Sequence, residues 1–270
     1  MKKLYYGSFA NKKREELVNE CIGFIKNDLK VVYILPSREA MFQVRRLFAE
    51  RLGGISNCWV MGFDNLERLI LAGSLDQSGI MSELEKSVII KDVLGRLPID
   101  DTVFEKVKDK PGFIRLLTEI IRLLKRSNIL PGEFFQIIQS LEGNLFRKCK
   151  SIYNIYHGYE EFKTQKGLMD IDDISLKAAE ACVHSRIFKD IGIIVIDGFI
   201  NIDPVNLELV KKILHTYPDI PVYVNVPFKN THNQEFVLGE IIKSFEELGF
   251  ERIEVEEKDD TVQDNQLHTI

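Results

Sequence analysis

The sequence predicts an α/β fold in which a parallel sheet is interrupted by a mostly helical insertion. Apolar, β-branched segments alternate with segments of helical periodicity near both ends of the chain. Between them, residues 82–181 carry helical periodicity and little strand pattern. Segments 30–36 (KVVYILP) and 191–197 (IGIIVID) are apolar almost throughout, which is typical of strands buried on both faces of a parallel sheet.

The first part of the chain alternates strands with helices. In order, we expect strand 4–6, helix 12–28, strand 30–36, helix 38–51, strand 58–63 and helix 66–71. Helix 12–28 places Leu17, Cys21 and Ile25 on one face. Ser37 can cap the next helix, and the Gly53-Gly54 pair ends it.

Helices dominate the middle, and the alternation returns near its end. Ser82 and Glu85 form a capping box, and Pro111 and Pro131 each open a helix. The later elements are helix 145–162, strand 191–197, helix 204–214, strand 221–227, helix 237–248 and edge strand 251–256. We therefore expect residues 1–80 and 186–258 to form a discontinuous α/β core and residues 81–185 to form the insertion. Residues 259–270 are expected to be a polar tail or the start of a missing region.

Composition excludes several classes of protein. The chain has 270 residues, a net charge of −5 and 45% hydrophobic residues, enough for one large core or two modest ones. No apolar run reaches the ~18–20 residues that span a bilayer, and the N-terminus is not a signal peptide. The four cysteines lie far apart, so we expect neither disulfides nor a zinc site. We expect a cytoplasmic protein with no membrane partner and no bound metal.

Charge is distributed unevenly along the chain. Residues 106–166 contain 12 Lys and Arg against 6 Asp and Glu, a net of +6, which leaves −11 for the remainder. A contact with a polyanion is therefore expected in the middle of the chain, although solvated helix faces explain the same charge. One helix carries the candidate phosphate contacts Arg115, Arg122, Lys125 and Arg126, three of them at roughly helical spacing.

The loop at residues 7–14 (GSFANKKR) stands where a phosphate-binding P-loop would stand, between a strand and a helix. Gly7 and Lys13 have the P-loop spacing, but Lys12 replaces the second glycine and Arg14 replaces the Ser or Thr. Those residues normally wrap the phosphate and bind magnesium. The loop is thus either a degenerate nucleotide site, with Gly7, Lys12 and Lys13, or an ordinary helix start.

A second loop carries the other half of such a site. Asp197 ends a hydrophobic strand, as the magnesium-binding acid of a Walker B motif does, but Gly198 stands where an acid that polarises water is usual. A simple Asp-Gly turn explains the same residues. Two motifs that have both lost hydrolytic groups favour a decayed ATPase over two chance matches.

Two further clusters are candidates. Ser37 and Arg38 follow the second long strand and could face a nucleic-acid backbone, or merely cap a helix. The carboxylates of Asp170, Asp172 and Asp173 invite a metal interpretation, but at this spacing they more often cap a helix start.

Several blocks together resemble a known family. They are 32–37 (VYILPS), 111–113 (PGF), 168–174 (LMDIDDI) and 195–199 (VIDGF) followed by Pro204. The combination resembles the N-terminal, helicase-like region of AddB, the second subunit of bacterial AddAB ATP-dependent helicase–nucleases. The 168–174 block is also similar to superfamily 1 helicases of the UvrD type. The match covers nearly the whole sequence but only the first part of such a subunit, so we expect a fragment or an N-terminal domain.

The resemblance implies a helicase domain 1A, a P-loop NTPase-like sheet, with a 1B-like helical insertion. It implies DNA end processing in double-strand break repair, with DNA and an AddA-type motor subunit as partners. An iron–sulfur cluster and a nuclease domain would lie in the absent C-terminal region. The resemblance favours an inactivated helicase-like domain that carries no catalytic residues, with no cofactor or at most weakly bound ATP and magnesium. A weak ATPase of the UvrD type and a purely structural adaptor are the alternatives.

Overall fold

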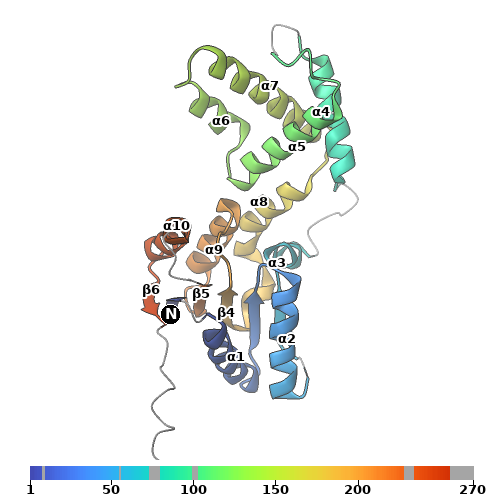
Figure 1. Ribbon diagram of the computed structural model, residues 1–270. Coiled ribbons are helices and arrows are strands. Elements are labelled where there is room, and N and C mark those ends of the chain that lie inside the picture. The colour runs from blue at the N-terminus through green and yellow to red at the C-terminus, as the bar shows by residue number, and fades with distance from the viewer. Residues whose placement is uncertain (8–9, 55, 73–79, 99–102, 228–233, 256–270) are drawn as a thin grey trace, which may run out of the picture. The chain divides into compact units, whose positions relative to one another are not determined.

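The computed structural model describes the chain except for residues 8–9, 55, 73–79, 99–102, 228–233 and 256–270. It divides into two compact units (Figure 1). Unit 1 comprises residues 1–66, 186–202 and 213–270, and unit 2 comprises residues 67–185 and 203–212. The insertion expected at residues 81–185 lies within unit 2.

Unit 1 contains one six-stranded sheet in which every pairing is parallel. The strand order is β3-β2-β4-β5-β1-β6. The strands are β1 Lys2–Gly7, β2 Lys30–Ile34, β3 Cys58–Met61, β4 Ile191–Asp197, β5 Val222–Pro227 and β6 Glu251–Glu254. The predicted α/β fold with a parallel sheet is confirmed, and β6 lies at one edge of the sheet.

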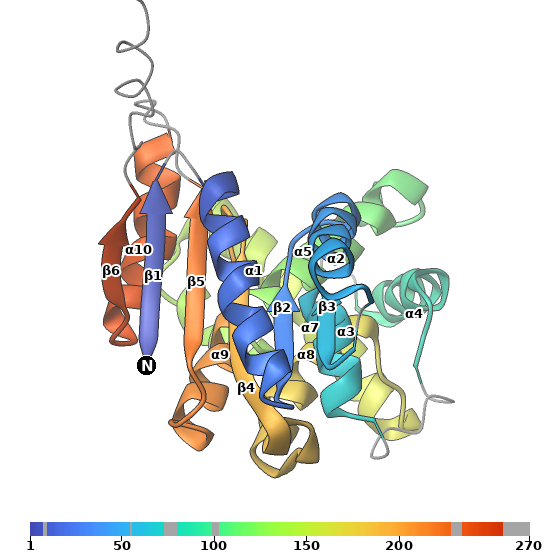
Figure 2. The same ribbon diagram turned by 90° about the horizontal axis from the view of Figure 1, so that it is seen from below.

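Helices cover the two faces of this sheet. Helix α1 (Ala10–Lys26) packs on β2, β4 and β5, and α2 (Arg38–Leu52) packs on β3. Figure 2 shows both in front of the sheet, with α10 (Gln234–Glu247) behind β1 and β6. A core cluster that includes Leu17, Tyr33, Phe48 and Val195 joins α1 and α2 to the sheet.

Local signals fix the boundaries of α2. The Ser37 hydroxyl accepts a hydrogen bond from the Ala40 amide at 3.2 Å, and Gly53 ends the helix at φ +71°. Glycine adopts this left-handed backbone conformation at the lowest energetic cost. The next elements differ slightly from expectation: β3 ends at Met61, and α3 (Phe63–Ile70) begins three residues earlier than predicted.

Unit 2 is built from helices. They are α4 Glu83–Arg96, α5 Pro111–Arg126, α6 Pro131–Ile138, α7 Gly143–Lys166 and α8 Ile171–Ala181, followed by the short 3₁₀ turn η3 Cys182–His184. A second 3₁₀ turn, η4 Arg186–Asp190, leads into β4, and α9 (Pro204–Thr216) is divided between the units. The predicted capping box of Ser82 and Glu85 is present, and Pro111 and Pro131 open their helices.

The core of unit 2 lies between α4, α5 and α7. It contains Ile90 and Leu94 from α4, Leu117 and Ile121 from α5, and Tyr156 from α7. No helix in the described part of the chain is long and apolar enough to cross a membrane.

Candidate functional site

Asp197 lies at the carboxyl end of β4, where a Walker B acid was expected, and its side chain is completely buried. Three side chains donate hydrogen bonds to the carboxylate. Arg14 Nε and Tyr33 Oη reach Oδ2 at 2.5 and 3.0 Å, and Asn225 Nδ2 reaches Oδ1 at 2.8 Å. The donors come from α1, β2 and β5, so the carboxylate joins one helix to the two strands that flank β4.

Arg14 and Asp197 form a largely buried ion pair, with the Arg14 side chain only 13% exposed. Burial alone would lower the pKa of Arg14, but the hydrogen bond to Asp197 and its charge outweigh burial and raise that pKa. Burial, followed by the charge of Asp197, raises the pKa of the Tyr33 phenol well above its usual range. Arg14 therefore stays charged and Tyr33 stays a hydrogen-bond donor.

The P-loop-like segment starts from a tightly packed glycine. Gly7 ends β1 at φ +146°, and a Cβ atom there would lie 2.5 Å from the carbonyl oxygen of Val255. A larger residue could not occupy this position without moving the chain beyond β6. Residues 8 and 9 and the side chain of Lys12 lie outside the described part of the chain.

Lys13, the counterpart of the P-loop lysine, contacts Tyr5 and Glu16. Its ammonium lies 4.0 Å from the centre of the Tyr5 ring and 2.7 Å from Glu16 Oε2. Strand β5 separates the β1 end, with Gly7, from the β4 end, with Asp197. Adjacent strands lie about 4.8 Å apart, so the two motifs stand about 10 Å apart along the sheet edge.

A magnesium–nucleotide complex does not fit the described residues as they stand. Such a complex needs a hydroxyl and an acid that hold the metal. Arg14 stands in place of the hydroxyl, and its guanidinium already contacts the acid. A cation that coordinated Oδ2 of Asp197 would have to displace Arg14.

Gly198 reinforces this misfit. It has φ +83°, and a Cβ built on it would lie 3.1 Å from Arg14 Nη2. The position where an active ATPase would place a second acid therefore favours glycine for two reasons, its backbone conformation and the neighbouring guanidinium.

The candidate nucleic-acid contacts differ in exposure and in ion pairing. Ser37 caps α2, and Arg38 is exposed in its first turn. On α5, Arg115 is exposed and Arg126 is about half exposed, with an ion pair to Asp203 at 3.3 Å. Arg122 pairs with Glu83 at 2.6 Å and with Glu119 at 3.0 Å.

Lys125 corrects one of our predictions. We expected it on a basic surface with its neighbours, but its side chain is 1% exposed. The reason is helical geometry: Lys125 lies one turn after Ile121 and two turns after Leu117, both of which are core residues. It cannot contact DNA from this position.

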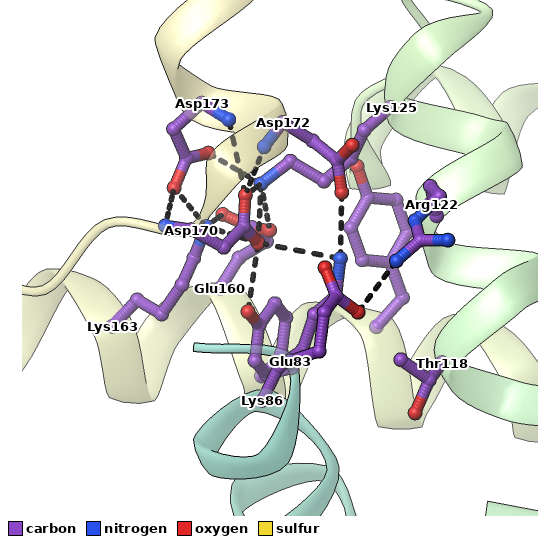
Figure 3. Close-up of polar contacts among 12 residues, drawn as sticks. Glu83, Lys86, Thr118, Arg122, Lys125, Glu160, Lys163, Asp170, Asp172 and Asp173 are labelled. Atoms are coloured by element: carbon purple, nitrogen blue, oxygen red, sulfur yellow. Dashed lines mark hydrogen bonds and ion pairs between the residues drawn. The ribbon is translucent and has the colours of Figure 1, made fainter. Parts of the chain in front are cut away.

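Lys125 belongs to a buried ion cluster in unit 2 (Figure 3). Its ammonium contacts both oxygens of Asp170, at 2.7 and 2.8 Å, and also Asp173. Lys163 lies 2.6 Å from Asp173 and 3.3 Å from Asp170. Lys86 lies 2.7 Å from Asp172 and 3.7 Å from Asp170.

Asp170 is the centre of this cluster. It accepts a hydrogen bond from Tyr159 Oη at 2.7 Å and caps α8 by accepting from the Asp172 and Asp173 amides, both at 3.0 Å. The predicted capping role is confirmed. Burial alone would raise the Asp170 pKa, but the charges of Lys125, Lys163 and Lys86 outweigh burial and hold it well below its usual range.

The same carboxylates do not offer a free metal site. Oxygens of Glu160, Asp170 and Asp173 lie within 4.8 Å of one another. However, the ammonium of Lys125 contacts all three residues, and so does that of Lys163. The described side chains thus supply their own counter-ions at this point.

Sequence reasoning missed most of the residues that pair with Asp197 and Asp170. Tyr33 and Asn225 sit inside apolar strand patterns, which gives no sign of a polar contact. The signal for the lysines was available: Lys86, Lys125 and Lys163 each lie one turn from a core residue of their own helix, namely Ile90, Ile121 and Tyr159.

Known proteins resemble this chain along most of its length. The family described as "ADDB, N-terminal" matches residues 4–248. A protein of Natranaerobius thermophilus is 27% identical over 205 residues, which cover 73% of this chain and 17% of the relative. A protein of Carboxydothermus hydrogenoformans is 27% identical over 241 residues, 83% of this chain and 21% of the relative. Both relatives are named as one subunit of an ATP-dependent helicase/deoxyribonuclease.

The chain thus spans about a fifth of the length of these relatives, and the family match includes most of β1, the P-loop-like segment and Asp197. Because the family match extends over both units, the chain belongs to the AddB family and corresponds to its N-terminal region.

Proposed function

We propose that this chain is the helicase-like N-terminal region of a DNA end-processing helicase–nuclease subunit, and that it binds DNA and a partner motor subunit without hydrolysing ATP. The observation that carries the proposal is that the residues at the ATPase motif positions already contact neighbouring side chains. Lys13, Arg14 and Asp197 are all engaged by neighbouring side chains. The names of the relatives support the helicase–nuclease part.

The proposed DNA contacts are Ser37, Arg38, Arg115, Arg122 and Arg126. Lys125 is no longer among them, and the partly satisfied Arg122 is the weakest of the five. Contacts to phosphates release counter-ions, so affinity should fall steeply as salt rises.

A partner subunit finds support in exposed apolar side chains. Leu84 on α4 is 75% exposed, and Leu123 on α5 is 62% exposed. We propose that these two side chains form part of a surface that contacts another protein. We propose an AddA-type motor subunit as that partner and the bacterial cytoplasm as the place of action. The iron–sulfur cluster and nuclease chemistry that the family implies would belong to the rest of the subunit.

DNA binding by the 270-residue chain tests the proposal. Fluorescence anisotropy with a labelled duplex that carries a single-stranded end should show an affinity that falls with salt. The charge reversals R115E and R126E together should weaken binding about tenfold or more, because two phosphate contacts become repulsions. The matched control is K211E with K243E, two exposed cations elsewhere in the chain. Equal losses in both pairs, or binding that salt does not change, would contradict the proposal.

ATP turnover on the same sample separates the alternatives. We expect no turnover that depends on Lys13. Turnover that K13A abolishes would support the weak ATPase instead. Absence of DNA binding, alone and with the partner, would favour the structural adaptor.

A further inference from the structure

We propose that the Arg14 guanidinium is a permanent internal substitute for the divalent cation that P-loop-type sites bind at this corner of the sheet. Unit 1 would then be held in one state that neither metal nor nucleotide controls. The inference rests on one part of the proposed function, the absence of ATP hydrolysis. The DNA contacts have no part in it.

The buried carboxylate of Asp197 needs a counter-charge. Its side chain is completely buried, and a buried carboxylate needs a counter-charge or must give up its own charge. A metal ion or a basic side chain can supply that counter-charge. Among the described residues, Arg14 is the one cation that forms an ion pair with Asp197, at 2.5 Å.

Both carboxylate oxygens of Asp197 accept hydrogen bonds, and Oδ2 accepts two of the three. Oδ2 accepts from Arg14 and from Tyr33, and Oδ1 accepts from Asn225. Metal coordination requires a lone pair directed at the ion. Arg14 and Tyr33 both direct a donor hydrogen at Oδ2, so a cation could approach that oxygen only after Arg14 leaves.

Arg14 and Gly198, two departures from an ATPase sequence, lie next to each other. The guanidinium occupies space beside Gly198, where a Cβ would lie 3.1 Å from Nη2. A second acid at residue 198 would compete with Asp197 for the same guanidinium and would need a strained backbone at φ +83°. Arginine at 14 and glycine at 198 are therefore compatible with each other.

The ion pair of Arg14 and Asp197 holds several elements of unit 1 together. Nucleotide switches work because the γ-phosphate and its metal hold elements that relax after hydrolysis. Here Arg14 ties the first turns of α1 to β4, and Tyr33 and Asn225 extend the tie to β2 and β5. The chain itself makes these contacts, and none of those described here requires a ligand.

Cation rescue tests the inference. In the full 270-residue chain, R14S restores the hydroxyl of a P-loop and leaves Asp197 without its counter-ion. Electron paramagnetic resonance with Mn²⁺ alone should detect no site in the wild-type chain that depends on Asp197. It should detect one site in R14S and none in R14S/D197N. At a Mn²⁺ concentration of about 100 times Kd, the Tm of R14S should rise by about 5–10 °C, while the wild-type Tm stays constant.

A matched control is R51S. Arg51 also pairs with a carboxylate of α1, Glu15, at 3.0 Å, but Glu15 is 60% exposed. Removing this surface arginine should create no Mn²⁺ site. A site in R51S as strong as that in R14S would overturn the inference, because it would show that any freed carboxylate suffices.

Two other results would also overturn it. One is saturable Mn²⁺ binding to the wild-type chain that D197N abolishes. The other is a folded R14S variant that gains no site. If R14S fails to fold, the comparison of wild type with D197N decides alone. None of these measurements involves DNA, so a failed DNA-binding assay leaves the inference standing.

Discussion

Unit 1 and unit 2 each bury a carboxylate almost completely, Asp197 in the first and Asp170 in the second, but the two acids meet different sets of partners. Asp197 has one cation, Arg14, and two neutral donors. Asp170 lies within 4 Å of three ammonium groups. The first is a single ion pair at the end of a strand, and the second is a shared network between helices.

The difference teaches how each site responds to the loss of one member. Removing one partner of a buried pair leaves an uncompensated charge, which is costly, whereas a network can redistribute its contacts. Arg14 has no substitute among the described contacts of Asp197. Each lysine around Asp170 has two others beside it.

The largest expected effect comes from removing the centre of the network. D170A would leave three buried ammonium groups and the Tyr159 hydroxyl short of an acceptor, and would remove the cap of α8. We expect a loss of about 5 kcal/mol in the free energy of unfolding. Urea denaturation followed by circular dichroism measures it. D190A, whose carboxylate is 57% exposed, is the control and should cost less than about 1 kcal/mol.

The next effect compares a sole cation with a shared one. R14M should cost about 3 kcal/mol, because Asp197 keeps only neutral donors. K163M should cost about 2 kcal/mol or less, because Lys125 contacts the same three carboxylates, Glu160, Asp170 and Asp173. Urea denaturation of both variants tests this order. In R14M/D197N the charge is gone, and part of the loss should return. A greater loss for K163M than for R14M would contradict the distinction between pair and network.

Lowering the pH should reduce the free energy of unfolding through protonation of Asp170. Its pKa in the folded chain lies below the ordinary value of 3.8, so its contribution to stability is fully present above pH 4 and is lost as pH falls toward the folded pKa. About 1 kcal/mol should be lost by pH 3. Urea titrations at a series of pH values should give a shallower acid slope for D170N. An unchanged slope would show that other carboxylates carry the acid sensitivity.

The smallest effect is expected at the rim of unit 2. Arg122 pairs with Glu83 and Glu119, whose side chains are about half exposed. R122A should change the free energy of unfolding by only about 0.5 kcal/mol, because solvent screens exposed pairs. Thermal denaturation at low and high salt checks this. A loss as large as that of K163M would mean that Arg122 belongs to the buried network.

Most of the fold could be predicted from periodicity. The strand at 191–197 matches β4 residue for residue, because a strand buried on both faces leaves an uninterrupted apolar run. Starts and ends were less accurate, as at α3, because several residues near Met61 can begin a helix. Strand order could not be predicted, since it depends on pairing between distant segments.

The candidate site was predicted less completely. The sequence placed Asp197 correctly at a strand end, and it identified Arg14 as a departure from the P-loop pattern. It could not reveal that these two residues, 183 positions apart, meet. Of the four candidate phosphate contacts on α5, Lys125 failed, because charge alone does not separate a solvated lysine from one that faces a buried acid.

The outer strand β6 has a consequence for how the protein behaves in concentrated solution. It is paired only with β1 among the described strands, so one row of its backbone groups faces outward. Such an edge invites further strands to add to it, and charged side chains discourage this. Three of the four β6 residues are charged, and Arg252 lies 4.3 Å from the Tyr6 ring while Glu254 accepts a hydrogen bond from that tyrosine. The open edge is therefore poorly suited to self-association and to fibril growth.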